Sequence, residues 1–425
     1  MTDLAHSLPY SGNIHRVELP NGLILMAYHN PAVRSVNVMG SLLAGSAYEA
    51  PDERMVAAVM GDMLIRGSTQ RDFDTIAADL EDIGAALDFS ARTFTLNYSG
   101  KALAEDFSHL LATIAELLRQ PSFPADHLAL VKREMRTSLQ VAMQDSRFRA
   151  GQAMREALYP VGHPLHQPLA GYAEALDAIT PEALRRFHKR LISPQRMTLI
   201  VVGAVEPLDV EREARRILGD WDAPAVARPT PPLAPQPAQE LRLHTTLPGK
   251  TQTDIVMGRL GPSRLDPDYM IASLANSILG EFGMMGRLGA SIREESGLAY
   301  YATSRLDPSV VQGVWSIAAG VADHNVELAI AKAKAEVRRL TEELVSEDEL
   351  ADNKNYFIGN LPLRLESSAG IANMLEAMER YQLGLDYLLT YPDRMNAITR
   401  DDVQRVASQY LDAEAFCIST AGSVG

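Results

Sequence analysis

The 425-residue sequence is poor in cysteine, and Cys417 is its only one. A single cysteine excludes an intrachain disulfide, a thiolate zinc cluster and a CxxC redox pair. Because Cys417 lies in a short strand-like run, it is most simply interpreted as a small buried hydrophobe. Cysteine chemistry is therefore not expected in this chain.

Basic clusters are missing as well. The net charge of −14 and a pI near 5.2 disfavour nucleic acid or an anionic membrane as a partner, because both bind clusters of Lys and Arg. Residues 1–15 contain no basic stretch followed by an apolar core, and no apolar run approaches the length of a membrane span. A cytoplasmic protein is expected, and a periplasmic location stays open if a leader was removed.

The composition is that of an ordinary soluble globular protein, with 46% hydrophobic and 22% charged residues. The length suits roughly two to four domains. Residues 222–239 are rich in Pro and Ala and read as an extended linker. The linker predicts an N-terminal domain at residues 1–221 and a C-terminal domain at residues 240–425.

The two halves end alike, which indicates an internal duplication. In each half an Ala-Ile-Thr sequence opens a helical stretch that leads into an apolar strand ending in glycine. The interval from Thr180 to Gly203 equals the interval from Thr399 to Gly422. Both threonines suit a helix N-cap, and the acidic residues after them suit the positive end of the helix dipole.

A second echo lies earlier in each half. A strand-like run at residues 87–98 precedes a helical stretch at 102–118, and a run at 310–319 precedes one at 325–344. No glycine-rich phosphate loop accompanies these elements. The pattern predicts an α+β fold of two homologous domains, each a mixed, mostly antiparallel sheet with helices packed on one face.

Four short segments occur in a recognisable order: Leu19–Leu23, Gly45–Glu49, Met63–Ser68 and Leu80–Ala85. This order resembles the pitrilysin/insulinase family of metallopeptidases with an inverted zinc motif, which includes the mitochondrial processing peptidase and small bacterial relatives. The resemblance runs essentially from end to end and includes the two-half design. It implies a processing-peptidase-like clamshell half and peptide substrates.

In that family the helix between the second and third segments carries His-x-x-Glu-His, in which two histidines bind Zn²⁺ and the glutamate activates a bound water. Here these five positions run from Ala58 to Asp62. Ala58 has no donor atom, Gly61 has no side chain to act as a base, and Asp62 offers a hard oxygen where the family uses imidazole. The resemblance therefore implies that this chain binds no catalytic zinc.

The family's third zinc ligand is a glutamate, and Glu134 matches it. Asp62 and Glu134 together are able to hold a hard cation weakly, but a solvated or salt-bridged remnant is favoured, and two carboxylates without a base make no hydrolase. His127 shares a helix face with Glu134 without restoring the motif. His163 and His166 lie in a proline-containing loop, which favours a structural use.

The second half contains Arg293 and, seven residues on, Tyr300. In the family an arginine and a tyrosine at these places face the bound peptide, where their donors support a substrate carbonyl. They are the expected substrate-binding pair of this chain. The glycine-punctuated turn Gly280–Gly286 is given no firm role, and Arg66 and Glu81 are interpreted as structural charges.

Together these features predict a non-catalytic, zinc-less subunit of a heterodimeric zinc peptidase, which supplies Arg293 and Tyr300 to a paralogous partner that carries the zinc. The alternative is a structural or assembly protein of the same fold with no proteolytic role. An autonomous peptidase with a metal at Asp62 and Glu134 is the least favoured. Substrate identity, and whether the chain forms a homodimer or a heterodimer, stay open.

Overall fold

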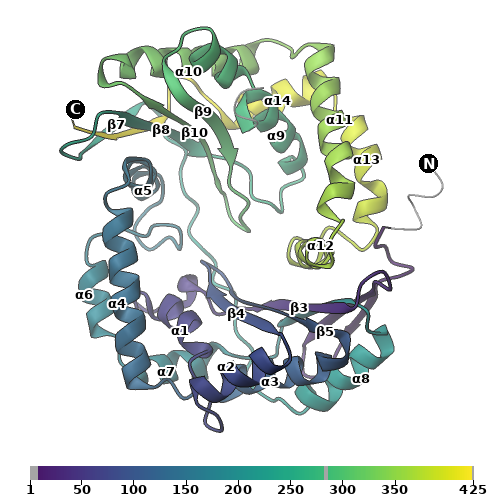
Figure 1. Ribbon diagram of the computed structural model, residues 1–425. Helices are drawn as coiled ribbons and strands as arrows, with labels where there is room; N and C mark the ends of the chain where they lie inside the picture. The colour runs from purple at the N-terminus through teal and green to yellow at the C-terminus, as the bar shows by residue number, and fades with distance from the viewer. Residues whose placement is uncertain (1–7, 282–285, 424–425) are drawn as a thin grey trace. The chain divides into compact units, whose positions relative to one another are not determined.

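The computed structural model describes residues 8–281 and 286–423, so Gly283 and its neighbours in the glycine-punctuated turn lie outside the described residues. The chain divides into two compact units (Figure 1). Unit 1 comprises Met1–Thr137, Ala170–Thr230 and Leu361–Thr390; unit 2 comprises Ser138–Leu169, Pro231–Asn360 and Tyr391–Gly425.

The two compact units differ in extent from the domains predicted at residues 1–221 and 240–425. One boundary, at Thr230, does fall inside the segment 222–239, which contains no helix or strand. However, each half of the chain also contributes one segment to the unit built mainly from the other half. Amphipathic patterns show that a helix has an apolar face, but not which sheet that face covers.

The sheet of unit 1 has, among the described residues, six strands in the order β1-β2-β6-β3-β5-β4. The strand β6 pairs in parallel with β2 and antiparallel with β3, and each of its residues is buried. A continuous apolar run such as Leu199 to Val202 is typical of a strand covered on both faces. The strands are β1 (His15–Glu18), β2 (Ile24–His29), β3 (Ser35–Leu42), β4 (Ala86–Ala91), β5 (Leu96–Leu103) and β6 (Thr198–Gly203).

One face of this sheet carries the main core of unit 1. Leu25, Val38 and Leu199 on the strands meet buried side chains of the covering helices, such as Leu110 and Phe187. Figure 1 shows α12 on the opposite face, where it contacts β6 and β3. The helices of unit 1 include α1 (Val56–Leu64), α2 (Phe73–Asp82), α3 (Phe107–Arg119), α6 (Tyr172–Ala178), α7 (Pro181–Leu191), α8 (Pro207–Leu218) and α12 (Ser368–Arg380), together with most of α4 (Ala125–Ala142).

The sheet of unit 2 repeats this topology without the counterpart of β1. Its described strands follow the order β7-β11-β8-β10-β9, and β11 pairs in parallel with β7 and antiparallel with β8, as β6 does with β2 and β3. The strands are β7 (Leu241–Thr246), β8 (Thr253–Leu260), β9 (Ala299–Leu306), β10 (Val314–Val321) and β11 (Cys417–Gly422).

The two faces of this second sheet are covered by helices from different halves of the chain. Helices α9 and α10 contact one face, and α14 packs on both helices. Helix α5 contacts β8 and β11 on the other face, as Figure 1 shows. These helices are α5 (Ser146–Leu158), α9 (Tyr269–Asn276), α10 (Val326–Glu342) and α14 (Arg400–Tyr410); α11 (Glu347–Arg364) and α13 (Tyr387–Ala397) each have most of their residues in unit 2.

The prediction of two homologous α+β units is confirmed by the matching strand orders. Thr180 and Thr399 are the N-caps of α7 and α14, and the side chain of each accepts a backbone N–H from the first turn. The single strand-like run at residues 87–98 is instead the hairpin of β4 and β5, and the helix after it begins at Phe107. Helices on one face were expected; α12 and α5 add a covering to the second face.

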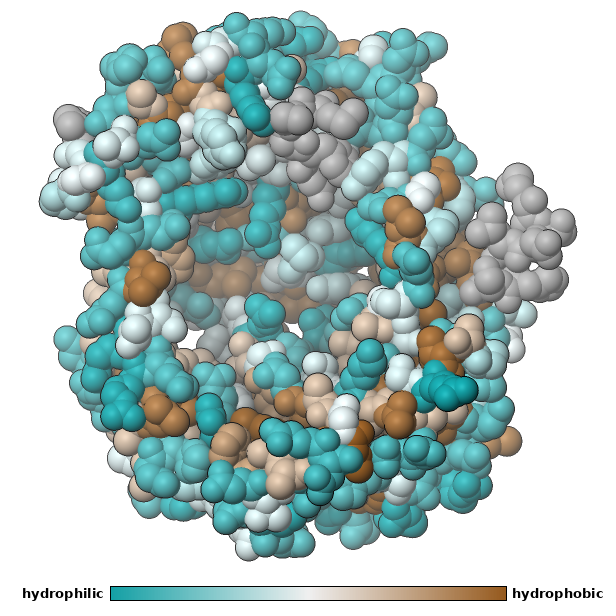
Figure 2. Space-filling view, viewed as in Figure 1, coloured by the Kyte–Doolittle hydropathy of each residue, from teal (hydrophilic) through white to brown (hydrophobic). Residues whose placement is uncertain are grey.

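The outer helices carry largely hydrophilic surfaces with hydrophobic residues scattered among them, as Figure 2 shows. Such single apolar side chains are normal on soluble proteins. Among the described helices none is both long and apolar enough to cross a bilayer.

A buried arginine, Arg259, ties the end of the Pro-rich segment to the sheet of unit 2. It donates from Nε to the carbonyl of Tyr410 at 3.0 Å and from Nη1 to that of Pro237 at 3.3 Å.

Candidate functional site

The helix α1 contains Ala58 to Asp62, the five residues that the family resemblance aligns with the zinc motif. Its N-terminus is capped by Glu49, whose carboxylate accepts the backbone N–H of Ala57 at 2.9 Å and that of Met55 at 3.2 Å. Met55 itself has a left-handed backbone with φ of 67°, which is an uncommon conformation for a residue with a side chain. The Gly45–Glu49 turn thus holds the start of α1, a role that sequence reasoning did not assign to Glu49.

The pKa of Glu49 is raised to about 7 by burial, although the two backbone N–H groups favour its charged form. A nearby acid, Glu53, pairs with Arg190 and accepts the backbone N–H of Ala50 at 3.0 Å. Two carboxylates therefore lie close to the first turn of α1, where the positive end of the helix dipole favours negative charge.

Gly61 lies where α1 packs against the edge strand β4. A Cβ atom placed on Gly61 would lie 3.0 Å from the backbone nitrogen of Ala91 and 3.5 Å from the carbonyl carbon of Ser90. The first of these distances is shorter than ordinary van der Waals contact. Position 61, which the family resemblance aligns with the glutamate base, therefore has no side chain, and a Cβ there would require β4 to shift by a few tenths of an ångström.

The other motif positions are less enclosed. Ala58 is half-buried, and Asp62 is exposed near the end of the helix. The pKa of Asp62 is raised chiefly by partial burial of its carboxyl group, and also by the nearby carboxylates of Asp88 and Glu134. The guanidinium of Arg66 lowers it. The Asp62 carboxyl group therefore lies near other carboxylates. Its oxygens are hard donors, whereas the zinc motif has an imidazole at this position.

Glu134 lies on α4 and pairs with Arg66, with 3.8 Å between Nη2 and Oε2. The Glu134 side chain is 56% exposed, so this pair contributes little to stability. The guanidinium of Arg66 also lies over the ring of Phe73, 5.1 Å from its centre. Within residues 8–281 and 286–423 no group of three or more His, Cys, Asp and Glu side chains could hold a metal ion, and the donors at the motif positions do not match those of the zinc motif.

Two of the three histidines, His127 and His163, pack against aromatic rings. The ring of His127 contacts Phe73, with 5.2 Å between centroids. His163 stacks on Tyr159 at 4.5 Å and accepts the backbone N–H of Leu165 at 3.1 Å, while His166 hydrogen-bonds the carbonyl of Tyr159 at 2.9 Å. These contacts accord with structural roles.

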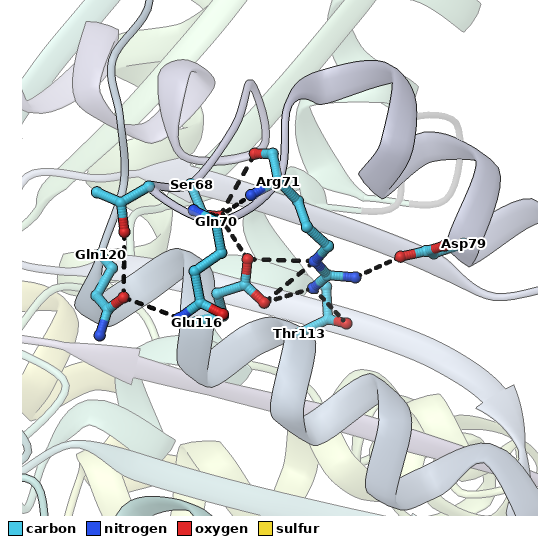
Figure 3. A network of polar contacts seen from close by, with 8 residues as sticks. Ser68, Gln70, Arg71, Asp79, Thr113, Glu116 and Gln120 are labelled. Atoms are coloured by element: carbon cyan, nitrogen blue, oxygen red, sulfur yellow. Dashed lines mark hydrogen bonds and ion pairs between the residues drawn. The ribbon is translucent and has the colours of Figure 1, made fainter.

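The turn after α1 is held by a polar network, drawn in Figure 3. Arg71 lies at its centre and donates to Glu116 at 2.7 Å and to Asp79 at 2.6 Å, while the hydroxyl of Ser68 donates to Glu116. Burial opposes the ionised form, but these hydrogen bonds lower the pKa of Glu116. The network satisfies its own members, so it stabilises the turn and leaves little free for a ligand.

Arg293 and Tyr300 are brought together in unit 2. Arg293 lies in a short helical segment, Gly289–Glu294, and Tyr300 is the second residue of β9. Between them Gly297 has a φ of 59°, and its N–H donates to the carbonyl of Arg293 at 2.9 Å. This reversal places the guanidinium carbon of Arg293 5.8 Å from the centre of the Tyr300 ring.

The Tyr300 side chain is 80% exposed, and its hydroxyl has no hydrogen bond to any part of the chain that the structure describes. The next residue, Tyr301, points to the other face of the strand, crosses Gly320 and donates to Asp254. Asp254 also accepts from Ser146 on α5, and Arg147 lies over the Tyr301 ring at 4.6 Å. The strand that carries Tyr300 is thereby anchored, a role for Tyr301 and Asp254 that sequence reasoning missed.

The glycine-punctuated turn closes on itself at its base. A Cβ on Gly286 would lie 2.5 Å from the Cα of Gly280, so position 286 has no room for a side chain. Sequence reasoning identified these glycines without a role, and close backbone approach accounts for Gly286. Residues 282–285 between them lie outside the described residues.

Two protein-family models match the sequence of this chain. The model described as Insulinase (Peptidase family M16) matches residues 25–169, and the model described as Peptidase M16 inactive domain matches residues 178–357. An uncharacterized zinc protease of Mycobacterium leprae is 26% identical over 413 residues, which cover 95% of this chain and 90% of the relative. One from Rickettsia bellii is 24% identical over 359 residues, covering 84% and 85%.

Solved structures agree with these matches. A peptidase M16 inactive domain from Pseudomonas fluorescens has a TM-score of 0.90 at 25% identity, covering 97% of this chain and 99% of that one. A protease from Helicobacter pylori has a TM-score of 0.80 at 19% identity, covering 98% and 100%. The second likeness shows the fold alone.

Proposed function

Because this chain belongs to peptidase family M16, the insulinase family, we propose that it is the zinc-less subunit of a heterodimeric zinc peptidase. In this proposal a paralogous partner holds the zinc and the catalytic glutamate, and Arg293 and Tyr300 of this chain bind the peptide substrate. The chain alone hydrolyses no peptide.

The close approach of α1 to β4 at Gly61 is the observation that carries the proposal. A missing glutamate alone would be a single substitution, but a Cβ there would lie 3.0 Å from the Ala91 nitrogen. Ala58 lacks a donor atom as well, and both features support a metal and a base that are supplied by another chain.

Arg293 and Tyr300 supply chemistry that suits a peptide. A guanidinium and a phenol are both donors, and a substrate carbonyl gains negative charge as water attacks it. The exposed Tyr300 ring and the half-buried Arg293 lie on and beside β9, which is an edge strand of its sheet among the described residues. An extended peptide pairs readily with a free sheet edge, which would carry its carbonyls past both donors.

The test is to mix the chain with a paralogue that has an intact His-x-x-Glu-His and to assay short peptides. We expect cleavage by the mixture, and about 100-fold lower kcat/KM when the complex contains Arg293→Ala with Tyr300→Phe. Arg212→Ala, which removes an exposed arginine on α8, serves as the control and leaves the rate unchanged.

If the complex with the double variant cleaves peptides as fast as the complex with the unchanged chain, Arg293 and Tyr300 do not bind the substrate. Failure of the two chains to associate would favour the structural or assembly alternative. Stoichiometric zinc in the purified chain would overturn the zinc-less assignment itself.

A further inference from the structure

A cavity of about 300 Å³ with both polar and apolar lining lies in unit 1, between the sheet and α12. It opens on the sheet face opposite to the main core, where alternate residues of β3, β5 and β4 point. Its polar lining consists of Asn37, Asp88, Ser99, Lys101 and Asn373, the last from α12.

These five side chains have no hydrogen bond or ion pair with any described residue. The contrast is with the Arg71 network of Figure 3, in which Ser68, Arg71 and Glu116 bind one another. A carboxylate, an ammonium, two amides and a hydroxyl thus line one cavity with their hydrogen-bonding capacity directed to solvent. These groups are therefore available to hydrogen-bond a ligand in the cavity.

The two charges in the cavity restrict the ligand. Asp88 is paired with Ser99 and Ala86 with Lys101 across β4 and β5, so Asp88 and Lys101 are diagonal neighbours on one face. They form no ion pair within 4 Å of each other, although both line the cavity. A metal cation would be repelled by Lys101 and a phosphate by Asp88. A ligand with one positive and one negative group satisfies both.

We propose that this cavity binds a zwitterion that carries an α-ammonium and a carboxylate, as a free amino acid or a dipeptide does. Asp88 accepts from the ammonium and Lys101 donates to the carboxylate. Asn37, Ser99 and Asn373 hydrogen-bond the polar groups between them. A volume of about 300 Å³, equal to roughly ten water molecules, suits a dipeptide better than a longer chain.

The cavity is next to the degenerate site, because the Asp88 carboxylate acts on Asp62 of α1. Binding would place a short peptide, or a terminal fragment, beside the edge strand β4. Its use during proteolysis rests on the proposed function. Binding itself needs only unit 1 and is measured on the chain alone, so its failure is distinct from failure of the heterodimer.

The experiment is a calorimetric or NMR titration of the full chain with Ala-Ala, N-acetyl-Ala-Ala, Ala-Ala-amide and alanine. We expect Ala-Ala to bind, and each cap to weaken binding about tenfold or more, since a charge-assisted hydrogen bond is lost. If alanine binds as tightly as Ala-Ala, the ligand is a free amino acid. If alanine binds more weakly than Ala-Ala, the ligand is a dipeptide.

Two variants connect each charge to its partner. Asp88→Asn should weaken the binding of Ala-Ala about tenfold, and N-acetylation of the peptide should then cause no further loss of affinity. Lys101→Met should also weaken the binding of Ala-Ala about tenfold, and amidation of the peptide should then cause no further loss. Asp74→Asn and Lys189→Met, both exposed and outside the cavity, are the controls and should bind normally. A Kd above about 10 mM for Ala-Ala, or equal binding of the capped peptides, would overturn the proposal.

Discussion

The two units share one sheet topology, but each uses the helix from the other half of the chain differently. In unit 2, Ala150, Met154 and Leu158 of α5 are buried in an apolar cluster against the sheet. In unit 1, α12 covers β6 and β3 and leaves a cavity, with Asp88 and Lys101 in its lining, beside β5 and β4. A second sheet face outside the main core is thus free to become either a further core or a binding surface.

The fit of α5 offers the largest test of this comparison. A Cβ on Gly258 would lie 2.1 Å from the sulfur of Met154 and 3.1 Å from a methyl of Val314. Gly258→Val should therefore lower the free energy of unfolding by about 1–3 kcal/mol, because the Met154 side chain and the Val314 methyl have to move to admit the new side chain. Urea denaturation measures this change.

Ser99→Val, on the cavity side of β5 in unit 1, is the matched control. It should change stability by no more than about 0.5 kcal/mol, because Ser99 is exposed. Equal costs for the two valines would mean that the two second faces do not differ in packing.

The second prediction concerns Gly61 in unit 1. Gly61→Glu should lower stability by about 1–2 kcal/mol, since its Cβ would press on the backbone of β4. Ala58→His, on a half-buried turn of the same helix, should cost less. Thermal or urea unfolding compares the two, and a Gly61→Glu chain as stable as the wild type would contradict the account of the closed base position.

The third and smallest effect is on the pH dependence, which differs in sign between the units. The pKa of Glu49 in unit 1 is raised from 4.5 to about 7, chiefly by burial. Its contribution to stability is full below about pH 4.5 and is lost as the pH rises to about 7. Glu49→Gln should abolish that loss, worth about 1 kcal/mol after solvent screening.

In unit 2 the pKa of Glu349 is lowered from 4.5 to about 2 by its hydrogen bond from Arg287, with burial opposing. Its contribution is present above about pH 4.5 and is lost as the pH falls toward 2. Glu349→Gln should therefore flatten the acid side of the stability curve, where Glu49→Gln flattens the side between pH 4.5 and 7. Unfolding series against pH measure both, and two variants that alter the same side would refute the assignment.

Much of the fold was predictable because it is local and repeated. The caps at Thr180 and Thr399 and the apolar strands after them follow from short-range patterns, and both are present. The hairpin of β4 and β5 was missed because the turn at residues 92–95 interrupts the strand pattern only briefly. The destinations of α5 and α12 were missed because the choice of a sheet is a long-range event.

The candidate site divides in the same way. The residue types at positions 58, 61 and 62 are readable directly, and the resemblance pointed to Arg293 and Tyr300. The anchoring of β9 by Tyr301 and Asp254 was not readable, because it depends on Tyr301 crossing Gly320 between two strands. The cavity in unit 1 was not readable either, because three strands and a helix distant in the sequence line it.

By itself the sequence determined the duplication, the family resemblance and the absence of the motif's histidines and glutamate at positions 58, 61 and 62, because each is a property of residue identity and spacing. Only the tertiary structure decided which sheet each exchanged helix covers, how closely α1 approaches β4 at Gly61, and that Asp88 and Lys101 line one cavity. Those outcomes depend on packing between residues far apart in the chain, which no local pattern records.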